Sequence, residues 1–253
     1  MTVRPRARDQ GRGVGLMAAP RLGDGALLVL RDQPRSAAAE AYRGMRTSLQ
    51  LLPQDKQSSV VFTSCNQGEG KTFCSVNLAI ALAAAGKRVL MVDADMRRPS
   101  LHKAFHYEAE TSGLSDFLAG QTAAPLVHIT EVENLSVVGA GPIPPNPSEL
   151  LGLPAMLQSC ACWAEEYDHV LFDAPPVSGI TDPLVLARVV GRAILVVRAG
   201  QTSDRSLRRT ADQLRNAGVD LLGVVLNGRR VPQGYEYGYG YVGAATGAGA
   251  SGR

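Results

Sequence analysis

The sequence predicts an α/β fold, built as a mostly parallel sheet with helices on both of its faces. Short apolar runs that favour strands alternate along the chain with longer amphipathic segments that favour helices. This alternation is typical of parallel sheets, whose strands are joined by helical crossovers. At 253 residues the chain can bury the core of one such domain, and its 45% hydrophobic and 19% charged residues are ordinary for a globular protein.

The composition divides the chain into three parts. Residues 1–25 are rich in Gly, Arg and Pro and are expected to form a flexible basic arm. Residues 26–231 hold the predicted single domain. Residues 232–253 are rich in Gly and Tyr, which cannot pack a core, and are expected to form a flexible tail. The net charge is +3, and we find neither a signal peptide nor a run of eighteen apolar residues.

The first elements of the domain precede a glycine-rich loop. The apolar run at 26–30 predicts a strand, which Pro34 separates from the next helix. Ser36 is a suitable N-cap for this helix, expected over 37–52. One apolar stripe on the helix consists of Tyr42, Met45, Leu49 and Leu52. A neighbouring stripe of Glu40, Arg43 and Arg46 fits either a solvated face with a local ion pair or an interface between subunits.

The strongest motif lies between a strand at 60–62 and an alanine- and leucine-rich helix. It consists of Gly68, Glu69, Gly70, Lys71 and Thr72. Glycines let backbone N–H groups turn toward an anion, and the helix after them offers its positive end. Lys71 can reach the β- and γ-phosphates of ATP, and the Thr72 hydroxyl can ligate Mg²⁺. Although Cys65 replaces the usual first glycine, the motif predicts a P-loop NTPase-like fold that binds ATP and Mg²⁺.

Two further strands end in carboxylates. The strand at 89–92 is followed by Asp93 and Asp95, and the strand at 169–172 is followed by Asp173. Ligands of open α/β sheets bind at the carboxyl ends of the strands, so these side chains are expected to converge on one metal–phosphate centre. One carboxylate can hold Mg²⁺, and another can accept a proton from an attacking hydroxyl. A role as a turn residue or helix cap remains open for each.

The remaining segments complete the alternation. Helices are expected over 101–105, 114–119, 148–161, 182–190 and 202–217. Strands are expected over 126–129, 135–138, 193–197 and 221–226. The four cysteines show no zinc-binding spacing, and with a nucleotide site and no secretion signal we interpret them as free thiols: Cys65, Cys74, Cys160 and Cys162.

Together these motifs resemble the bacterial tyrosine kinases, a family with a P-loop fold. The family's Walker A loop matches residues 68–72, its second motif h-h-h-D-x-D-x-R matches 90–97, and its Walker B strand matches 170–173. GLSDFLAG, PPNPSELL, LVVRAGQTS and GVVLN also match. The resemblance runs from about residue 27 to 228, and the tail extends it. Gln67 in place of a frequent Pro, Cys65, and Gly191-Arg192 in place of an acidic residue depart from the family pattern.

The resemblance implies roles for single residues. Lys71 would stabilise the transferring phosphoryl group, while Thr72, Asp173 and Asp93 would organise Mg²⁺. Asp93 would also be the base toward a tyrosine hydroxyl, supported by Asp95. The remaining phosphate-loop residues and Asn227, the latter at the adenine, would bind the nucleotide. Arg97 belongs to the second motif but receives no role. The phosphoacceptors would be Tyr235, Tyr237, Tyr239 and Tyr241.

The resemblance also implies an assembly and a setting. The helix carrying Glu40, Arg43 and Arg46 would join subunits into a homo-oligomeric ring, in which the tail of one subunit enters the active site of the next. The protein would be cytoplasmic, peripheral at the inner face of the cell membrane, and activated by a separate membrane-spanning partner. Its autophosphorylation would regulate extracellular polysaccharide synthesis and export. Nucleic acid is not expected among its partners.

Two other functions remain open. A deviant-Walker ATPase of the partitioning or division-site type would act as an ATP-switched dimer. Those ATPases place a lysine near the start of the loop, where this chain has Cys65 and Asn66. The other alternative is a nucleotide-binding assembly factor without catalysis, against which four intact residues argue: Lys71, Thr72, Asp93 and Asp173.

Overall fold

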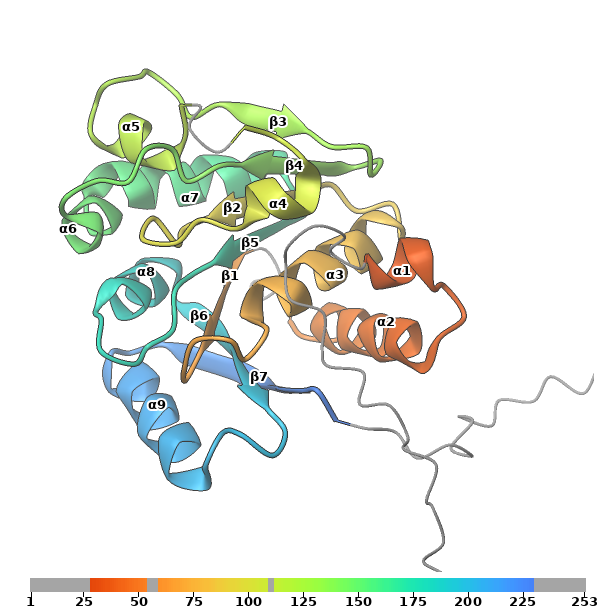
Figure 1. Ribbon diagram of the computed structural model, residues 1–253. Helices are drawn as coiled ribbons and strands as arrows, with labels where there is room; N and C mark the ends of the chain where they lie inside the picture. Colours follow the sequence, from red (N-terminus) through yellow and green to blue (C-terminus); the bar gives the residue numbers. More distant parts are fainter. Residues whose placement is uncertain (1–27, 54–58, 109–111, 230–253) are drawn as a thin grey trace, which may run out of the picture.

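A computed structural model describes residues 28–53, 59–108 and 112–229. Within these ranges the strands form a seven-stranded sheet in the order β3-β4-β2-β5-β1-β6-β7 (Figure 1). Every neighbouring pair is parallel except β3 with β4, which is antiparallel. The predicted α/β fold with one mostly parallel sheet is therefore confirmed. The arm and tail expected at 1–25 and 232–253 lie outside the described residues.

The bounds of the strands follow the apolar runs of the sequence. They are β1 (Ser59–Ser64), β2 (Val89–Asp93), β3 (Val127–Ile129), β4 (Leu135–Val138), β5 (His169–Asp173), β6 (Arg192–Arg198) and β7 (Asp220–Asn227). The helices are α1 (Val29–Asp32), α2 (Ala37–Gln50), α3 (Lys71–Ala83), α4 (Leu101–Phe105), α5 (Leu114–Leu118), α6 (Pro147–Leu151), α7 (Pro154–Glu166), α8 (Asp182–Val190) and α9 (Asp204–Asn216). None of the helices in the described ranges is long and apolar enough to cross a membrane.

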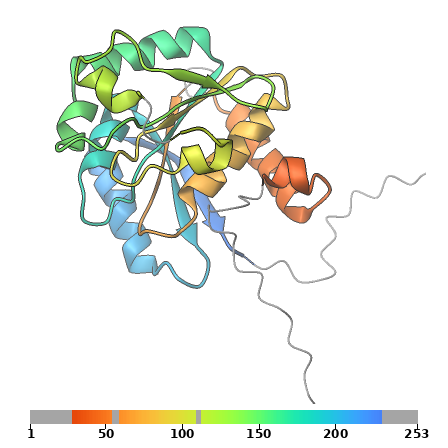
Figure 2. The same ribbon diagram turned by 45° about the horizontal axis from the view of Figure 1, so that its top comes forward.

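Helices cover both faces of the sheet, as Figures 1 and 2 show from two directions. Successive side chains of a strand point to opposite faces, so β1 contributes to two cores. Val60 and Phe62 pack with α1 to α4, whereas Val61 packs with α5 to α9. All three side chains are fully buried. The central strands thus pack against a core on each face of the sheet, which fixes the positions of their carboxyl ends relative to one another.

The strand expected at 26–30 is wrong where the structure describes it. Val29 begins the short helix α1 instead, and residues 26 and 27 are outside the described ranges. The Asp32 carboxylate accepts a hydrogen bond from the Leu28 N–H (2.8 Å), and the Asn77 side chain accepts one from the Val29 N–H (2.7 Å). Because side chains satisfy these donors, the segment needs no neighbouring strand to pair with.

The single helix expected over 148–161 is two helices. Gly152 ends α6, Leu153 is extended, and Pro154 begins α7. Proline has no N–H to donate to the preceding turn and forces the residue before it out of the helical conformation, which explains the break.

Candidate nucleotide and phosphotransfer site

The loop between β1 and α3 has the backbone conformation that its glycines permit. Gly68 and Gly70 have φ angles of +82° and +91°, in the left-handed region that favours glycine. A Cβ added to Gly70 would lie 2.0 Å from Asn227 Nδ2, so this position also lacks space for a side chain. Lys71 is the first residue of α3, and the positive end of this 13-residue helix faces the loop.

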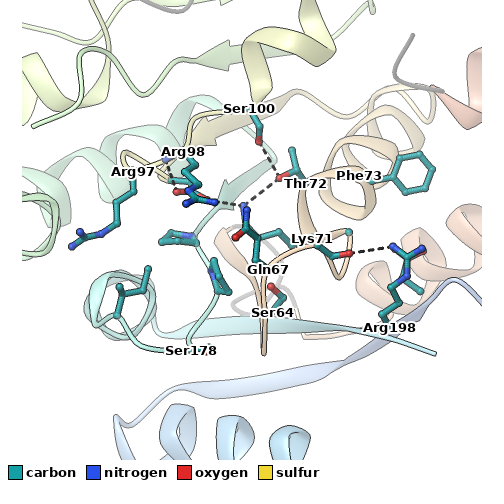
Figure 3. A pocket seen from close by; sticks show the side chains of 17 residues that line it. Ser64, Gln67, Lys71, Thr72, Phe73, Arg97, Arg98, Ser100, Ser178 and Arg198 are labelled. Carbon is teal, nitrogen blue, oxygen red and sulfur yellow. Dashed lines mark hydrogen bonds and ion pairs between the residues drawn. The ribbon is translucent and has the colours of Figure 1, made fainter. Parts of the chain in front are cut away.

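The Glu69 side chain braces the loop from behind. It is buried, and its carboxylate accepts hydrogen bonds from the Asn66 N–H (2.9 Å) and the Thr202 hydroxyl (2.5 Å). Arg198 holds the loop from another side, because its Nη1 donates to the Gly68 carbonyl (3.1 Å; Figure 3). The Glu69 side chain is thus engaged within the protein. The expected role of Glu69 in nucleotide binding therefore stays a prediction, and it concerns the backbone of Glu69 and not its side chain.

Four of the predicted site residues converge at the carboxyl edge of the sheet. Lys71 Nζ lies 3.1 Å from Asp95 Oδ2 and 3.3 Å from Asp173 Oδ2. The Thr72 hydroxyl donates to the same oxygen of Asp173 at 2.5 Å. The Lys71 and Asp95 side chains are 12% and 7% exposed, and that of Asp173 is fully buried. Figure 3 shows Lys71 and Thr72 side by side, with Ser100 beyond Thr72.

Asp93 sits deeper than Asp95. Its carboxylate accepts hydrogen bonds from the backbone N–H groups of Ser100 and Leu101 (both 2.9 Å) and of Asp95 (3.2 Å). It therefore orders the segment between β2 and α4. Asp95 lines the pocket that opens over this cluster, whereas Asp93 is not among the lining residues. This geometry favours Asp95 over Asp93 for direct contact with a substrate.

The charges of this cluster oppose one another. Burial and the neighbouring Asp173 raise the pKa of Asp93 to about 7. Burial also raises the pKa of Asp173, against the effects of Lys71 and Thr72. Burial lowers the pKa of Lys71, but the carboxylates of Asp173 and Asp95 outweigh it and the pKa is raised. Lys71 thus stays charged, while the fold disfavours the ionised forms of Asp93 and Asp173.

The pocket over these groups has a volume of about 580 Å³ (Figure 3). Its size is within the range of pockets for small ligands. Lys71, Thr72 and Asp95 line one part, and Arg198 and Asn227 also line it. The Asn227 amide donates to the Glu69 carbonyl (2.9 Å), so the predicted adenine contact stays a prediction. Arg198 was missed from the sequence, although it ends β6 within the matched segment LVVRAGQTS.

The residues present fit a magnesium ion. Asp173 Oδ1 is buried and has no hydrogen-bond partner among the described residues. An orphaned carboxylate oxygen beside the Thr72 hydroxyl is the oxygen-only chemistry that Mg²⁺ prefers. In the described part of the chain no group of three or more His, Cys, Asp or Glu side chains is arranged around a metal position. Mg²⁺ usually keeps waters and takes phosphate oxygens as ligands, so a site with few protein ligands suffices.

The residues proposed for the subunit interface have local partners within the chain. Arg43 pairs with Glu40 on the same helix and donates from Nη2 to the Pro34 carbonyl (2.8 Å). Arg46 donates to the Ala81 carbonyl at 3.4 Å. The interface therefore stays a prediction. The four tail tyrosines lie outside the described residues.

A glycine-rich loop after β1, a lysine and threonine at the start of α3, and a buried carboxylate ending β5 together define a P-loop NTPase. A family model described as ParA, the NUBPL iron-transfer P-loop NTPase, matches residues 56–233. The tyrosine-protein kinase YwqD of Bacillus subtilis is 35% identical over 213 residues, which cover 84% of this chain and 90% of YwqD. The chain therefore belongs to the tyrosine-protein kinases of bacteria, within the wider class of P-loop NTPases.

Other similarities agree with this assignment. The putative tyrosine-protein kinase EpsB of Ralstonia solanacearum is 41% identical over 85% of this chain, which spans 29% of EpsB. The kinase domain of the Escherichia coli tyrosine kinase ETK superposes with a TM-score of 0.75 at 34% identity, covering 84% of this chain and 85% of that domain. The cell division ATPase MinD of Pyrococcus furiosus is more distant, with a TM-score of 0.57 at 25% identity over 67% of this chain.

Proposed function

We propose that this tyrosine-protein kinase uses ATP and Mg²⁺ to phosphorylate Tyr235, Tyr237, Tyr239 and Tyr241 of another copy of the same chain. One observation supports the proposal most strongly. At the phosphate loop, Lys71 lies within hydrogen-bonding distance of Thr72, Asp95 and Asp173, and Thr72 in turn donates to Asp173. A cation, a hydroxyl and two carboxylates in one cluster beside a pocket are groups that suit phosphoryl transfer to a hydroxyl.

Each group has a role in this proposal. Mg²⁺, when bound, neutralises charge on the phosphates, and Thr72 and Asp173 hold it. Lys71 stabilises the charge of the transferring phosphoryl group, because its ammonium is fixed by two carboxylates. Asp95 lines the pocket and accepts the proton of the tyrosine hydroxyl. Asp93 orients Asp95 through its hydrogen bond with the Asp95 N–H. This order reverses the one implied by the resemblance.

The phosphate acceptor is proposed from the end of the described chain. β7 ends at Asn227, and Asn227 lines the pocket. The described chain thus ends two residues after a side chain that lines the pocket, and the four tyrosines follow later in the sequence. We further propose that the copies form a ring through Glu40, Arg43 and Arg46, and that a separate membrane-spanning protein activates them at the inner face of the membrane. We propose extracellular polysaccharide synthesis as the setting of this kinase, as the family resemblance implies; one matched relative is the putative tyrosine-protein kinase CapB of Staphylococcus aureus.

The main test traces label from ATP. Purified protein is incubated with Mg²⁺ and γ-labelled ATP, with its activator where known, and phosphotyrosine is mapped. We expect label on residues 235–241, lost in Lys71→Met. The control is Lys87→Met, an exposed lysine at the other end of the sheet, which should keep the label. Turnover of ATP without labelled protein would favour the ATP-switched ATPase. Binding without turnover would indicate an assembly factor.

A mixing experiment separates transfer between copies from transfer within one copy. The Lys71→Met chain keeps its tyrosines, and a second chain keeps Lys71 but has all four tail tyrosines changed to Phe. We expect the Lys71→Met chain to become labelled when the two are mixed. Label on wild type but none in this mixture would contradict transfer between copies. In sedimentation, Arg43→Ala with Arg46→Ala should reduce the size of the assembly.

A further inference from the structure

Arg97 forms an ion pair that links two separate parts of the carboxyl edge of the sheet. Its Nε lies 2.6 Å from Asp182 Oδ2, and its Nη2 donates to Asp182 Oδ1 at 3.1 Å. This two-point geometry is the strongest form of an arginine–carboxylate pair, and a lysine cannot reproduce it. The Asp182 side chain is 1% exposed, whereas that of Arg97 is 45% exposed.

The pair belongs to a set of contacts that joins three segments, each of which follows a strand. Arg97 lies between β2 and α4, and Asp182 is the first residue of α8, which comes after β5. Ser148, in α6 after β4, donates to the Asp182 carboxylate, and its hydroxyl lies 3.1 Å from that of Thr181. Ser148 and Arg97 are 34 and 85 positions from Asp182 in the chain. The Arg97 pair and Ser148 thus tie the turn after β2 to the starts of α6 and α8.

Both ends of the pair are continuous with the pocket wall. Arg97 lies two residues after Asp95, and Asp95 Oδ1 accepts a hydrogen bond from the Arg98 N–H (3.1 Å) while Asp95 Oδ2 pairs with Lys71. On the other side, Ser178 and Ile180 line the same pocket shortly before Asp182. In Figure 3 the Arg97 side chain points away from Lys71 and Thr72. Its guanidinium is thus directed to Asp182 rather than to the phosphate loop.

A buried carboxylate resists separation from its partner. Removing Arg97 would leave the buried Asp182 carboxylate without its counter-charge, so the fold favours the paired geometry. Burial raises the pKa of Asp182, but Arg97 and Ser148 outweigh it and the pKa is lowered. The carboxylate is therefore ionised and holds Arg97 at neutral pH. Fixing Arg97 fixes the turn that carries Asp95.

We infer that Arg97 is a positioning residue for phosphotransfer, which acts by pairing with Asp182 and holding Asp95 against the wall formed by the segment before α8. This inference rests on the proposed function, because it assigns Asp95 to contact with the phosphate acceptor. It gives a role to the arginine of the D-x-D-x-R motif that the sequence left without one. Although Arg97 also lines the pocket, its role in this inference is exerted through Asp95 and not through contact with ATP or tyrosine.

The test is a double-mutant cycle with Arg97→Ala, Asp182→Ala and the double variant. Misplacing a reacting group by about 1 Å can reduce a rate by about 100-fold. We expect each single variant to lower kcat for tyrosine phosphorylation by roughly 10- to 100-fold, with KM for ATP changed by less than about threefold. The double variant should be no slower than the slower single variant, because either change removes the same contact.

Matched controls come from the same two strands. Arg88 and Asp168 form an exposed ion pair (3.1 Å) just before β2 and β5, at the opposite end of the sheet. Arg88→Ala, Asp168→Ala and their double variant should leave kcat within about twofold. Melting temperatures of all variants identify loss of folding. If Asp182→Ala does not fold, Arg97→Lys and Arg97→Gln replace the cycle, and both should lose kcat because neither makes the two-point pair.

Two results would overturn the inference. Rate losses that multiply in the double variant would mean that the two residues act independently. A large rise in KM for ATP on changing Arg97, with no matching effect of Asp182, would mean that Arg97 binds the nucleotide directly. The same cycle is read on ATP turnover, so a chain that turns over ATP without labelling tyrosine would contradict the proposed function while the coupling is still measured.

Discussion

The two ends of β2 and β5 use the same kinds of residue for different purposes. At the amino ends, Arg88 and Asp168 form an ion pair whose side chains are 58% and 35% exposed. At the carboxyl ends, Lys71 faces Asp95 and Asp173 with side chains that are at most 12% exposed. Exposed pairs contribute about 0–1 kcal/mol, whereas buried charges cost several kcal/mol before their mutual attraction offsets it.

The pKa directions show which end is arranged for stability. Hydrogen bonds from the Arg88 N–H and side chain lower the pKa of Asp168, so the fold favours its ionised form. Burial and Asp173 raise the pKa of Asp93 to about 7, so the fold disfavours its ionised form. Buried carboxylates whose ionised form the fold disfavours are characteristic of functional sites. The difference indicates that the carboxyl edge is maintained for chemistry and the amino edge is not.

The largest expected effect is that of Lys71→Met on stability. At pH 8 this change leaves the carboxylates of Asp95 and Asp173 buried without their cation, and we expect a loss of about 3 kcal/mol or more in the free energy of unfolding. Arg88→Met should cost no more than about 1 kcal/mol. Denaturant unfolding measures both. Equal small losses would contradict the proposed difference between the two ends.

The second prediction concerns pH, measured without metal. Because the pKa of Asp93 is raised from 3.8 to about 7 in the folded state, ionisation opposes folding, and its cost grows as pH rises from about 4 to 7. Relative to Asp93→Asn, the free energy of unfolding of the wild type should fall by an amount of the order of a few kcal/mol between pH 4 and pH 7.

Asp168 should behave in the opposite sense. Its folded pKa is lowered, so its contribution is present above about pH 4 and is lost as pH falls below that value. The difference between wild type and Asp168→Asn should therefore favour the wild type above pH 4. Unfolding curves at several pH values compare the wild type with Asp93→Asn and with Asp168→Asn. If the two differences in the free energy of unfolding changed with pH in the same direction, this assignment would be contradicted.

A third, smaller effect is expected from glycine geometry. Gly70→Ala combines a φ of +91° with a Cβ that would lie 2.0 Å from Asn227 Nδ2. We expect it to cost about 2 kcal/mol and to weaken nucleotide binding at least tenfold. Gly86, before β2, has a φ of +76° with no atom within 4 Å of an added Cβ. Gly86→Ala should therefore cost about 1 kcal/mol and leave binding unchanged. Calorimetry of unfolding compares the stability of the two variants, and titration calorimetry compares their affinity for nucleotide.

The sequence predicts the parts of this site that depend on local pattern. Lys71, Thr72 and Asp173 are predictable because a phosphate loop and an acidic strand end recur at fixed places in a parallel sheet. Helix α1 is not predictable, since Asn77, 48 residues away, satisfies the Val29 N–H. The Arg97–Asp182 pair joins residues 85 positions apart, and no spacing rule indicates it. The proposed exchange of roles between Asp93 and Asp95 rests on backbone donors that the fold brings to Asp93.

The most direct test of the difference between the two ends is Asp173→Asn. Its Oδ1 has no partner among the described residues, and an amide oxygen at the position of Oδ2 still accepts from Thr72. Because Lys71 keeps its pair with Asp95 and burial already disfavours the ionised form of Asp173, we expect the free energy of unfolding at pH 8 to be unchanged or increased. Tyrosine phosphorylation should fall at least about 100-fold, since Asp173 is proposed to hold Mg²⁺. A variant that unfolds readily but still transfers phosphate would contradict a carboxyl edge maintained for chemistry.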